Sequence, residues 1–158
     1  MEERNQKEQK EFEEKVLEIR RVSKKTEGGN RFRFTALVVV GDRKGRVGMA
    51  LGKAPGVRPA IDKATSKAKK NLQKVVLENG TIPFEIRVKE GAADILLRPA
   101  PAGTGISLGG AARTIAELAG IQDITGKILG TRNKYSNALA MFKALERIRE
   151  LSRKYETK

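Results

Sequence analysis

Hydrophobic and polar residues alternate along residues 31–40, which is typical of a β-strand with one buried face. The apolar face consists of Phe32, Phe34, Ala36, Val38 and Val40. Turn-forming residues at 41–45 and a second alternating run over residues 46–51 follow, and together they predict a β-hairpin. One face of its second strand is small, so a helix or another backbone can approach it closely. The small residues are Gly48, Ala50 and Gly52.

Apolar residues spaced three and four apart predict two helices around this hairpin. The clearer helix covers residues 57–77. Its apolar side consists of Ile61, Ala64, Ala68, Leu72 and Val75. The thinner stripe of Phe12, Val16 and Ile19 predicts a helix over residues 8–20, within an N-terminal helical extension at 1–20. With residues 22–26 as a further strand, the first half is expected to form an antiparallel sheet with one helix packed on it.

The second half starts with another predicted hairpin, in which residues 84–88 and 94–98 alternate on either side of a turn. The elements expected after it are a glycine-rich loop at 103–110, a helix that ends at Ala119 before Gly120, and a last helix over roughly 137–151. A turn-like break at Glu78-Asn79-Gly80 separates the two halves. We therefore predict an α+β protein with small domains at 21–79 and 80–152 and a basic tail at 153–158.

Charge changes the picture, because the chain of 158 residues has 33 Lys and Arg against 19 Asp and Glu, a net charge of +14. Residues 1–20 carry −2 and residues 81–158 carry +5, whereas residues 21–80 carry +11, from fifteen basic and four acidic residues. Such a surplus exceeds what solubility requires and favours a polyanionic partner. The asymmetry also favours different roles for the two halves.

The composition excludes most catalytic chemistry. The chain has no Cys and no His, so it lacks thiolate metal sites, cysteine nucleophiles, histidine bases and Ser-His-Asp triads. No pair of carboxylates is placed for acid–base work, and Asp42, Asp62, Asp94 and Asp123 lie where capping is expected. The longest apolar run, Ala36 to Val40, is too short to span a membrane, and the charged N-terminus is unlike a signal peptide. We expect a cytoplasmic protein that is not an enzyme and has no metal or other cofactor.

Lysines at spacings of four, three and four form a stripe on the predicted helix at 57–77. They are Lys63, Lys67, Lys70 and Lys74. A solvated helix face is the structural alternative, but such faces usually include acidic residues, and this helix has only Asp62 near its start. Phosphate groups of RNA or DNA would supply the missing anions.

The segment from Val22 to Arg31 contains Gly28-Gly29 and predicts a hairpin turn. Its basic flanks favour an additional role, which is insertion against a nucleic-acid backbone. The flanking residues are Arg21, Lys24, Lys25, Arg31 and Arg33. Aromatic residues make up only 4% of the chain, so stacking platforms are scarce, and Phe32 and Phe34 are expected in the core. The expected partner is therefore structured RNA bound by its backbone and shape.

The glycine-rich run at 103–110 could instead hold a nucleotide phosphate, as in the small-metabolite kinases. Its spacing matches neither G-x-G-x-x-G nor the P-loop, and an antiparallel hairpin precedes it instead of a βαβ unit. Tight packing, or contact of the backbone amides with RNA or protein, is favoured. A small phosphotransferase remains one alternative, and a free double-stranded-RNA-binding regulator is the other.

Separated motifs occur in both halves in a characteristic order. They are Arg21-Val22-Ser23-Lys24, Gly28-Gly29, Arg31 through Asp42, Gly45-Arg46-Val47-Gly48, Gly52-Lys53-Ala54, Leu97 through Gly105, Gly109-Gly110 and Glu117-Leu118-Ala119-Gly120. Over residues 12–150 the chain resembles the fifth protein of the bacterial small ribosomal subunit. It departs from the family pattern at Phe84, at Gly56 and at Lys134-Tyr135-Ser136-Asn137.

The resemblance implies a first domain similar to a double-stranded-RNA-binding fold and a second with a left-handed βαβ crossover. It also implies a structural protein that binds rRNA between the body and head of the subunit, contacts the fourth and eighth small-subunit proteins, and contributes to accuracy, assembly and the messenger RNA entry channel. The residues matching the neck loop are Val22, Ser23, Lys24, Gly28 and Gly29, and those matching the interface with the fourth protein are Gly103, Gly105 and Arg113.

The sequence and the resemblance together give a set of basic candidates for rRNA contact. They are Arg21, Lys24, Lys25, Arg31, Arg33, Arg43, Lys44, Arg46, Lys53, Lys63, Lys67, Lys70, Lys74, Arg132 and Lys134.

Overall fold

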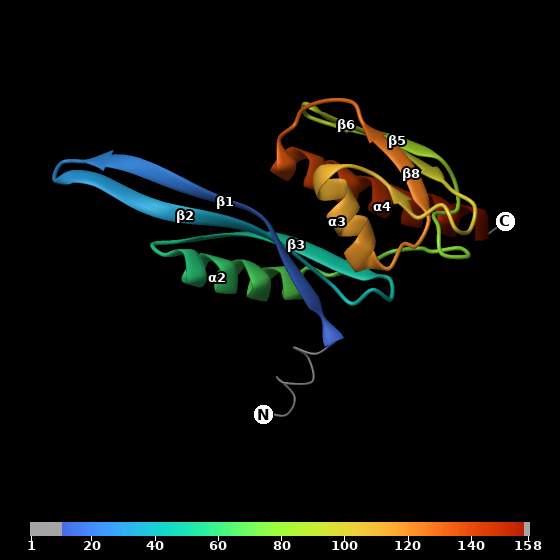
Figure 1. The fold of residues 1–158 in the computed structure, drawn as a ribbon, viewed down its shortest axis with the longest axis horizontal. Helices are drawn as coiled ribbons and strands as arrows, with labels where there is room; N and C mark the ends of the chain where they lie inside the picture. The colour runs from blue at the N-terminus through green and yellow to red at the C-terminus, as the bar shows by residue number, and fades with distance from the viewer. Residues whose placement is uncertain (1–10, 157–158) are drawn as a thin grey trace. The chain divides into compact units, whose positions relative to one another are not determined.

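The computed structural model describes residues 11–156 and divides the chain into two compact units. The first unit extends to Val40 and resumes over Gly48–Leu72, and the second comprises Gly41–Val47 and the chain from Gln73 onward. Figure 1 shows a sheet and at least one helix in each unit, which confirms the predicted α+β class.

The N-terminal sheet has the strand order β1-β2-β3-β4. Its strands are β1 (Glu13–Thr26), β2 (Gly29–Gly41), β3 (Arg46–Ala54) and the two-residue β4 (Gln73–Lys74). The helix α2 (Val57–Lys70) covers one face (Figure 1). The predicted strands at 22–26, 31–40 and 46–51 are thereby confirmed.

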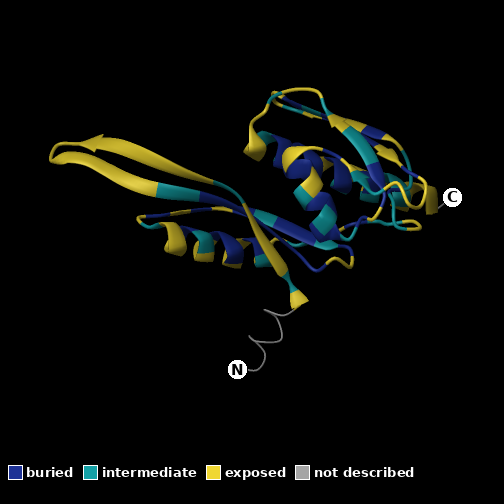
Figure 2. Cartoon of the chain, in the orientation of Figure 1, coloured by how far each residue is buried: buried dark blue, intermediate teal, exposed yellow. Residues whose placement is uncertain are grey.

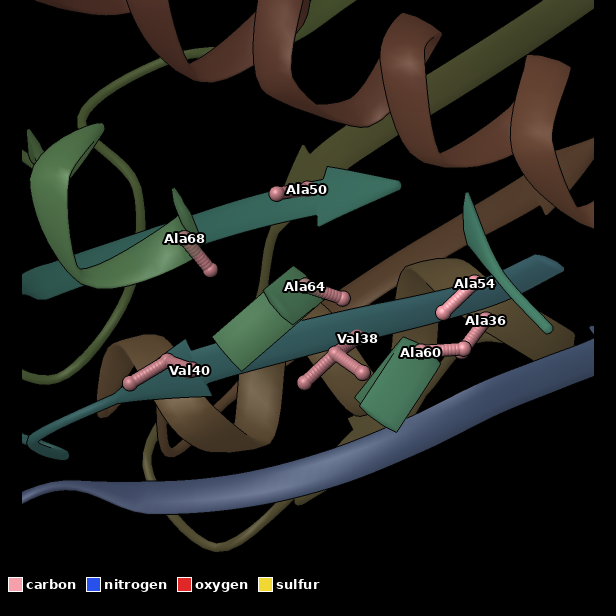
Figure 3. Close-up of a cluster of buried hydrophobic side chains, with 8 residues drawn as sticks. All are labelled: Ala36, Val38, Val40, Ala50, Ala54, Ala60, Ala64 and Ala68. Atoms are coloured by element: carbon pink, nitrogen blue, oxygen red, sulfur yellow. The ribbon is translucent and has the colours of Figure 1, made fainter. Parts of the chain in front are cut away.

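Small residues bring α2 close to the sheet. The buried cluster consists of Ala36, Val38 and Val40 from β2, Ala50 and Ala54 from β3, and Ala60, Ala64 and Ala68 from α2 (Figure 3). A Cβ atom at Gly52 would clash with the backbone of Ala60 and Ala64, and one at Gly48 would clash with the carbonyl of Ala68. The predicted close approach on the small face of β3 is confirmed.

Two predicted helices differ from the structure. Residues 13–20 belong to β1, because pairing with β2 overrides the helical propensity of a segment rich in Glu and Lys. Residues 8–10 of that predicted helix, and the remainder of the N-terminal extension up to residue 10, lie outside the described residues. The helix predicted over 57–77 ends at Lys70, where the N–H of Asn71 donates to the carbonyl of Ala68 at 3.0 Å.

The second unit is a four-stranded sheet with the order β5-β6-β8-β7. The strands are β5 (Ile86–Glu90), β6 (Ala93–Pro99), β7 (Ile106–Ser107) and β8 (Ile124–Ile128), and the helices are α3 (Gly110–Ala119) and α4 (Lys134–Glu156). The helix α4 packs against β5, β6 and α3 (Figure 1). The β5–β6 hairpin and the end of α3 at Gly120, where φ is +88°, confirm two predictions.

The residue pattern did not predict β7 and β8, although the family resemblance implies a βαβ crossover in this domain. They pair in parallel through Ile106↔Ile124 and Ser107↔Thr125, and α3 joins them, so these elements form a βαβ unit. The side chains of Ile124, Ile115 and Leu118 are fully buried in this unit. None of the helices within residues 11–156 combines the length and the apolar character that a membrane crossing requires.

Candidate nucleic-acid interface

A long, exposed hairpin forms one end of the first unit. Every residue from Arg20 to Arg33 is exposed, and we call this segment the hairpin arm (Figure 2). The arm exists because β1 has 14 residues and β2 has 13, whereas the neighbouring β3 has nine. A tight turn at Glu27-Gly28 closes it, with the Thr26 hydroxyl donating to the carbonyl of Gly29 at 2.9 Å. Gly29 has a φ of +132°, which favours glycine at this position.

The arm carries six basic residues against the single acid Glu27. They are Arg20, Arg21, Lys24, Lys25, Arg31 and Arg33. Arg20 forms an ion pair with Glu18 at 3.0 Å. Among residues 11–156, no carboxylate pairs with Lys24, Lys25, Arg31 or Arg33. Because strand side chains alternate, Arg31 and Arg33 lie on the face of β2 opposite to the one that packs on α2.

The helix α2 presents a second group of exposed basic residues, Lys63, Lys67 and Lys70. Their spacing places them on one side of the helix, away from the buried alanines. Lys67 and Lys70 lie in the last turn, where cations also stabilise the helix dipole, so their placement has a structural reason as well. The Nζ of Lys63 donates to the carbonyl of Lys53 on β3 at 3.5 Å, and Lys53 is exposed.

Lys74 does not extend this lysine stripe, which corrects the sequence prediction. It lies in β4, where it is opposite Arg46 of β3 in the antiparallel strand register. The reason is that the chain leaves the helix at Asn71 and adds a short strand to the sheet. The neighbouring Lys69, which sequence reasoning did not select, is half-buried and forms an ion pair with Glu14 at 3.1 Å.

The turn between β2 and β3 presents Arg43 and Lys44 to solvent and is organised by Asp42. The buried Oδ1 of Asp42 accepts hydrogen bonds from the backbone N–H groups of Lys44 at 2.8 Å and Arg46 at 3.0 Å, and its Oδ2 accepts one from the Arg46 Nε at 2.8 Å. Burial raises the pKa of Asp42, but these hydrogen bonds outweigh it and hold the pKa below its ordinary value. Arg46 therefore has part of its charge compensated within the protein.

We expect Asp42→Asn to lower the free energy of unfolding by about 1–3 kcal/mol at pH 7, because an amide oxygen replaces a buried carboxylate that accepts three hydrogen bonds. A carboxyl whose pKa falls on folding stabilises the protein above its unfolded pKa, here 3.8, and loses that contribution as the pH falls through the folded value. The difference between the variant and the wild type should therefore shrink below about pH 3.8. Urea titrations at pH 7 and pH 3 measure it. Asp62→Asn, at an exposed carboxylate, is the control, and equal effects of the two substitutions at pH 7 would contradict the assignment.

Two candidates of the second unit lie at the start of α4. Arg132 and Lys134 are exposed, and the Asn133 side chain caps the helix by accepting a hydrogen bond from the N–H of Tyr135 at 3.0 Å. The Asn137 amide donates to the carbonyl of Thr131 at 3.0 Å. This departure from the family pattern thus forms a capped helix start with its basic side chains outside.

The glycine-rich loop is held by a buried acid. The Oδ1 of Asp123 accepts hydrogen bonds from the N–H groups of Gly103 at 3.2 Å and Gly105 at 2.9 Å. These are the amides that a phosphate loop would need, and a carboxylate beside them repels phosphate. The geometry therefore disfavours nucleotide binding. Arg113 is exposed on α3 and forms an ion pair with Glu117 at 3.2 Å.

The structure thus groups the candidates by unit. The first unit brings together the residues of the hairpin arm and the lysines of α2, with Lys53. The second unit contains Arg43, Lys44, Arg46, Lys74, Arg132, Lys134 and the glycine-rich loop. Sequence reasoning placed Phe32 in the core, which is wrong, because 46% of its surface is exposed on the arm.

Two family models match the chain, one in each half. The family model for the N-terminal domain of ribosomal protein S5 matches residues 12–76, and the model for the C-terminal domain matches residues 88–157. The small ribosomal subunit protein uS5 of Thermus thermophilus is 53% identical over 138 residues, which cover 87% of this chain and 85% of that protein. The protein of the same name from Fusobacterium nucleatum subsp. nucleatum is 49% identical over 142 residues, covering 90% of this chain and 87% of that protein. The chain belongs to the ribosomal protein S5 family.

Proposed function

We propose that the chain is a structural protein of the small ribosomal subunit that binds rRNA mainly through its first unit. The observation that carries the proposal is the hairpin arm, where five exposed basic side chains, with Arg21 among them, have no carboxylate partner among residues 11–156. Unpaired cations on a protruding hairpin gain most from phosphate contact, since they give up no internal ion pair. The names and coverage of the relatives support the same conclusion.

The mechanism follows from the geometry of the two basic groups. A two-stranded arm with basic residues on its sides can insert between RNA helices and neutralise phosphates from both. The lysines of α2 can follow one RNA backbone, since Lys63, Lys67 and Lys70 repeat along a single helix face. Binding is driven by the release of counterions, so its strength depends steeply on salt.

The finer roles are part of the proposal. We assign the chain to the neck between body and head, with Val22, Ser23, Lys24, Gly28 and Gly29 near the neck RNA. The second unit would contact the fourth small-subunit protein through Gly103, Gly105 and Arg113, and the eighth protein would be a further neighbour. Contributions to accuracy, to subunit assembly and to the messenger RNA entry channel, and a ribosome-bound place in the cytoplasm, complete the assignment. The exposed Gly103 and Arg113 support it, as does the loop that Asp123 holds in place.

Crosslinking in cells tests this function. The RNA attached to the chain is sequenced, and the protein is followed through a gradient after a high-salt wash. Crosslinks confined to a few segments of small-subunit rRNA, with the chain retained on that particle, are expected. Scattered crosslinks and a chain in the soluble fraction would favour a free regulator that binds double-stranded RNA.

A single lysine on α2 gives a quantitative prediction. Lys67→Ala should weaken binding about 5-fold at 0.15 M salt and lower the slope of log affinity against log salt by about 0.9, which is the loss of one phosphate contact. Binding of the full chain to small-subunit particles from depleted cells measures both. Lys143→Ala is the matched control, because Lys143 already pairs with Glu90 at 2.8 Å. Equal salt slopes for the two variants would show that Lys67 does not contact an RNA phosphate.

A further inference from the structure

The placement of Phe32 calls for a partner outside the chain. Its side chain has the same parity along β2 as Phe34, Ala36 and Val38, so it continues the apolar stripe that packs on α2. The helix covers Ala36 and Val38 and leaves Phe32 beyond its reach, with 46% of the residue exposed. A half-exposed aromatic ring among basic side chains offers an apolar contact next to groups that attract phosphate.

Arg21 of β1 lies directly over this ring. Its guanidinium carbon is 3.9 Å from the centre of the Phe32 ring, which is van der Waals distance and a favourable position for a cation–π interaction. Arg21 has no carboxylate partner in the part of the chain that the structure describes. Arg21 is itself exposed, so a ligand can reach its side chain.

We propose that Arg21 and Phe32 form a stacking platform for one unpaired nucleobase of the bound RNA. The inference rests on the proposed rRNA-binding function and adds a specific ligand to the hairpin arm. A planar guanidinium that is already held 3.9 Å over a phenyl ring is preorganised, so a base can stack on the pair without ordering either side chain anew. The N–H groups at the edge of the guanidinium can donate hydrogen bonds to the phosphate of the same nucleotide.

A base fits this site better than a phosphate alone. Phosphate contact would need only the charge of Arg21, and it gives no role to the exposed ring. Bases that are unstacked from RNA helices are commonly bound on aromatic rings and arginine planes. The low aromatic content of the chain is no obstacle, because a single base needs a single platform.

To test the platform, full-length chain is added back to small-subunit particles isolated from cells that lack it. The wild type and three variants are compared. Phe32→Leu keeps apolar volume and removes the ring, Arg21→Lys keeps the charge and removes the plane, and Phe32→Tyr keeps the ring. Phe32→Leu and Arg21→Lys should each weaken binding about 5- to 150-fold with an unchanged salt slope, whereas Phe32→Tyr should bind like the wild type. Because Phe32 is exposed, urea midpoints should match across the forms.

Ultraviolet crosslinking of the same particles identifies the ligand. The wild-type chain should carry one nucleotide adduct at Phe32, found after cleavage at Glu27 and Glu78, and Phe32→Leu should lose it. Wild-type affinity for Phe32→Leu or for Arg21→Lys, or a crosslink map without Phe32, would overturn the platform and leave rRNA binding intact. If the wild-type chain itself fails to bind the particles, the proposed function fails, and the platform fails with it.

Discussion

Replacing Lys25, Arg31 and Arg33 of the hairpin arm by glutamine should weaken binding to small-subunit particles about 100-fold at 0.15 M salt. Each phosphate contact contributes about 0.9 to the slope of log affinity against log salt, so the loss of three contacts lowers the slope by about 2.7. These side chains are exposed and have no carboxylate partner among residues 11–156, so the whole of their charge is available to RNA. Binding titrations at four or more salt concentrations measure the affinity and the slope together.

The matched control removes the same charge from the second unit, with Arg87, Arg98 and Lys143 changed to glutamine. Each of these side chains is compensated within the chain, by Asp94, Glu85 and Glu90 respectively. The Arg87 pair is bidentate, with distances of 3.0 and 2.8 Å, and it lowers the pKa of Asp94. Equal losses for the two triple variants would mean that net charge alone drives binding and that the arm has no special place in it.

The arm shows where sequence reasoning succeeds and where it fails. The glycine turn and the basic flanks could be recognised, because both depend on residues close together in the chain. The strand β1 could not be recognised, since the spacing of Phe12, just before it, and of Val16 and Ile19 within it also fits a helix. Only pairing with β2 decides between helix and strand.

The difference in length between α2 and β2 explains why the sequence pattern wrongly predicts a core position for Phe32. Alternation alone gives every apolar residue of β2 the same environment. A helix of 14 residues is about 21 Å long, however, and a strand of 13 residues is about 43 Å long, so α2 can cover only about half of β2. The sequence pattern predicts a helix up to residue 77, and a helix of that length would cover more of β2 than the observed α2 does.

The second unit was predicted well wherever local signals exist. The β5–β6 hairpin and the end of α3 at Gly120 follow from turn chemistry and from the αL conformation that glycine adopts. The strand β7 has only two residues, and its pairing with β8 depends on the crossover through α3. The role of Asp123 was equally hidden, because its partners Gly103 and Gly105 precede it by 20 and 18 residues.

Packing beneath α2 gives the largest expected effect on stability. Gly52→Val should lower the free energy of unfolding by about 3 kcal/mol or more, because a Cβ at this position would meet the backbone of Ala60 and Ala64. The direction of the change is informative. Valine has a higher strand propensity than glycine, so the substitution would stabilise a strand that had no helix packed against it. Urea denaturation measures the loss, and hydrogen exchange should show that the amides of α2 and β3 lose protection.

Leu51→Val is the matched control, because Leu51 is the neighbouring residue of β3, lies on the opposite face and is 41% exposed. Its effect should stay within about 0.5 kcal/mol. Gly52→Ala should fall between the two, at about 1–3 kcal/mol, because it introduces the clash without the additional methyl groups. A stabilised Gly52→Val protein would show that α2 can move away from the sheet at little cost. In that case the lysines on its outer side would have no fixed position relative to the hairpin arm, and the division of the interface into two basic groups would lose its structural basis.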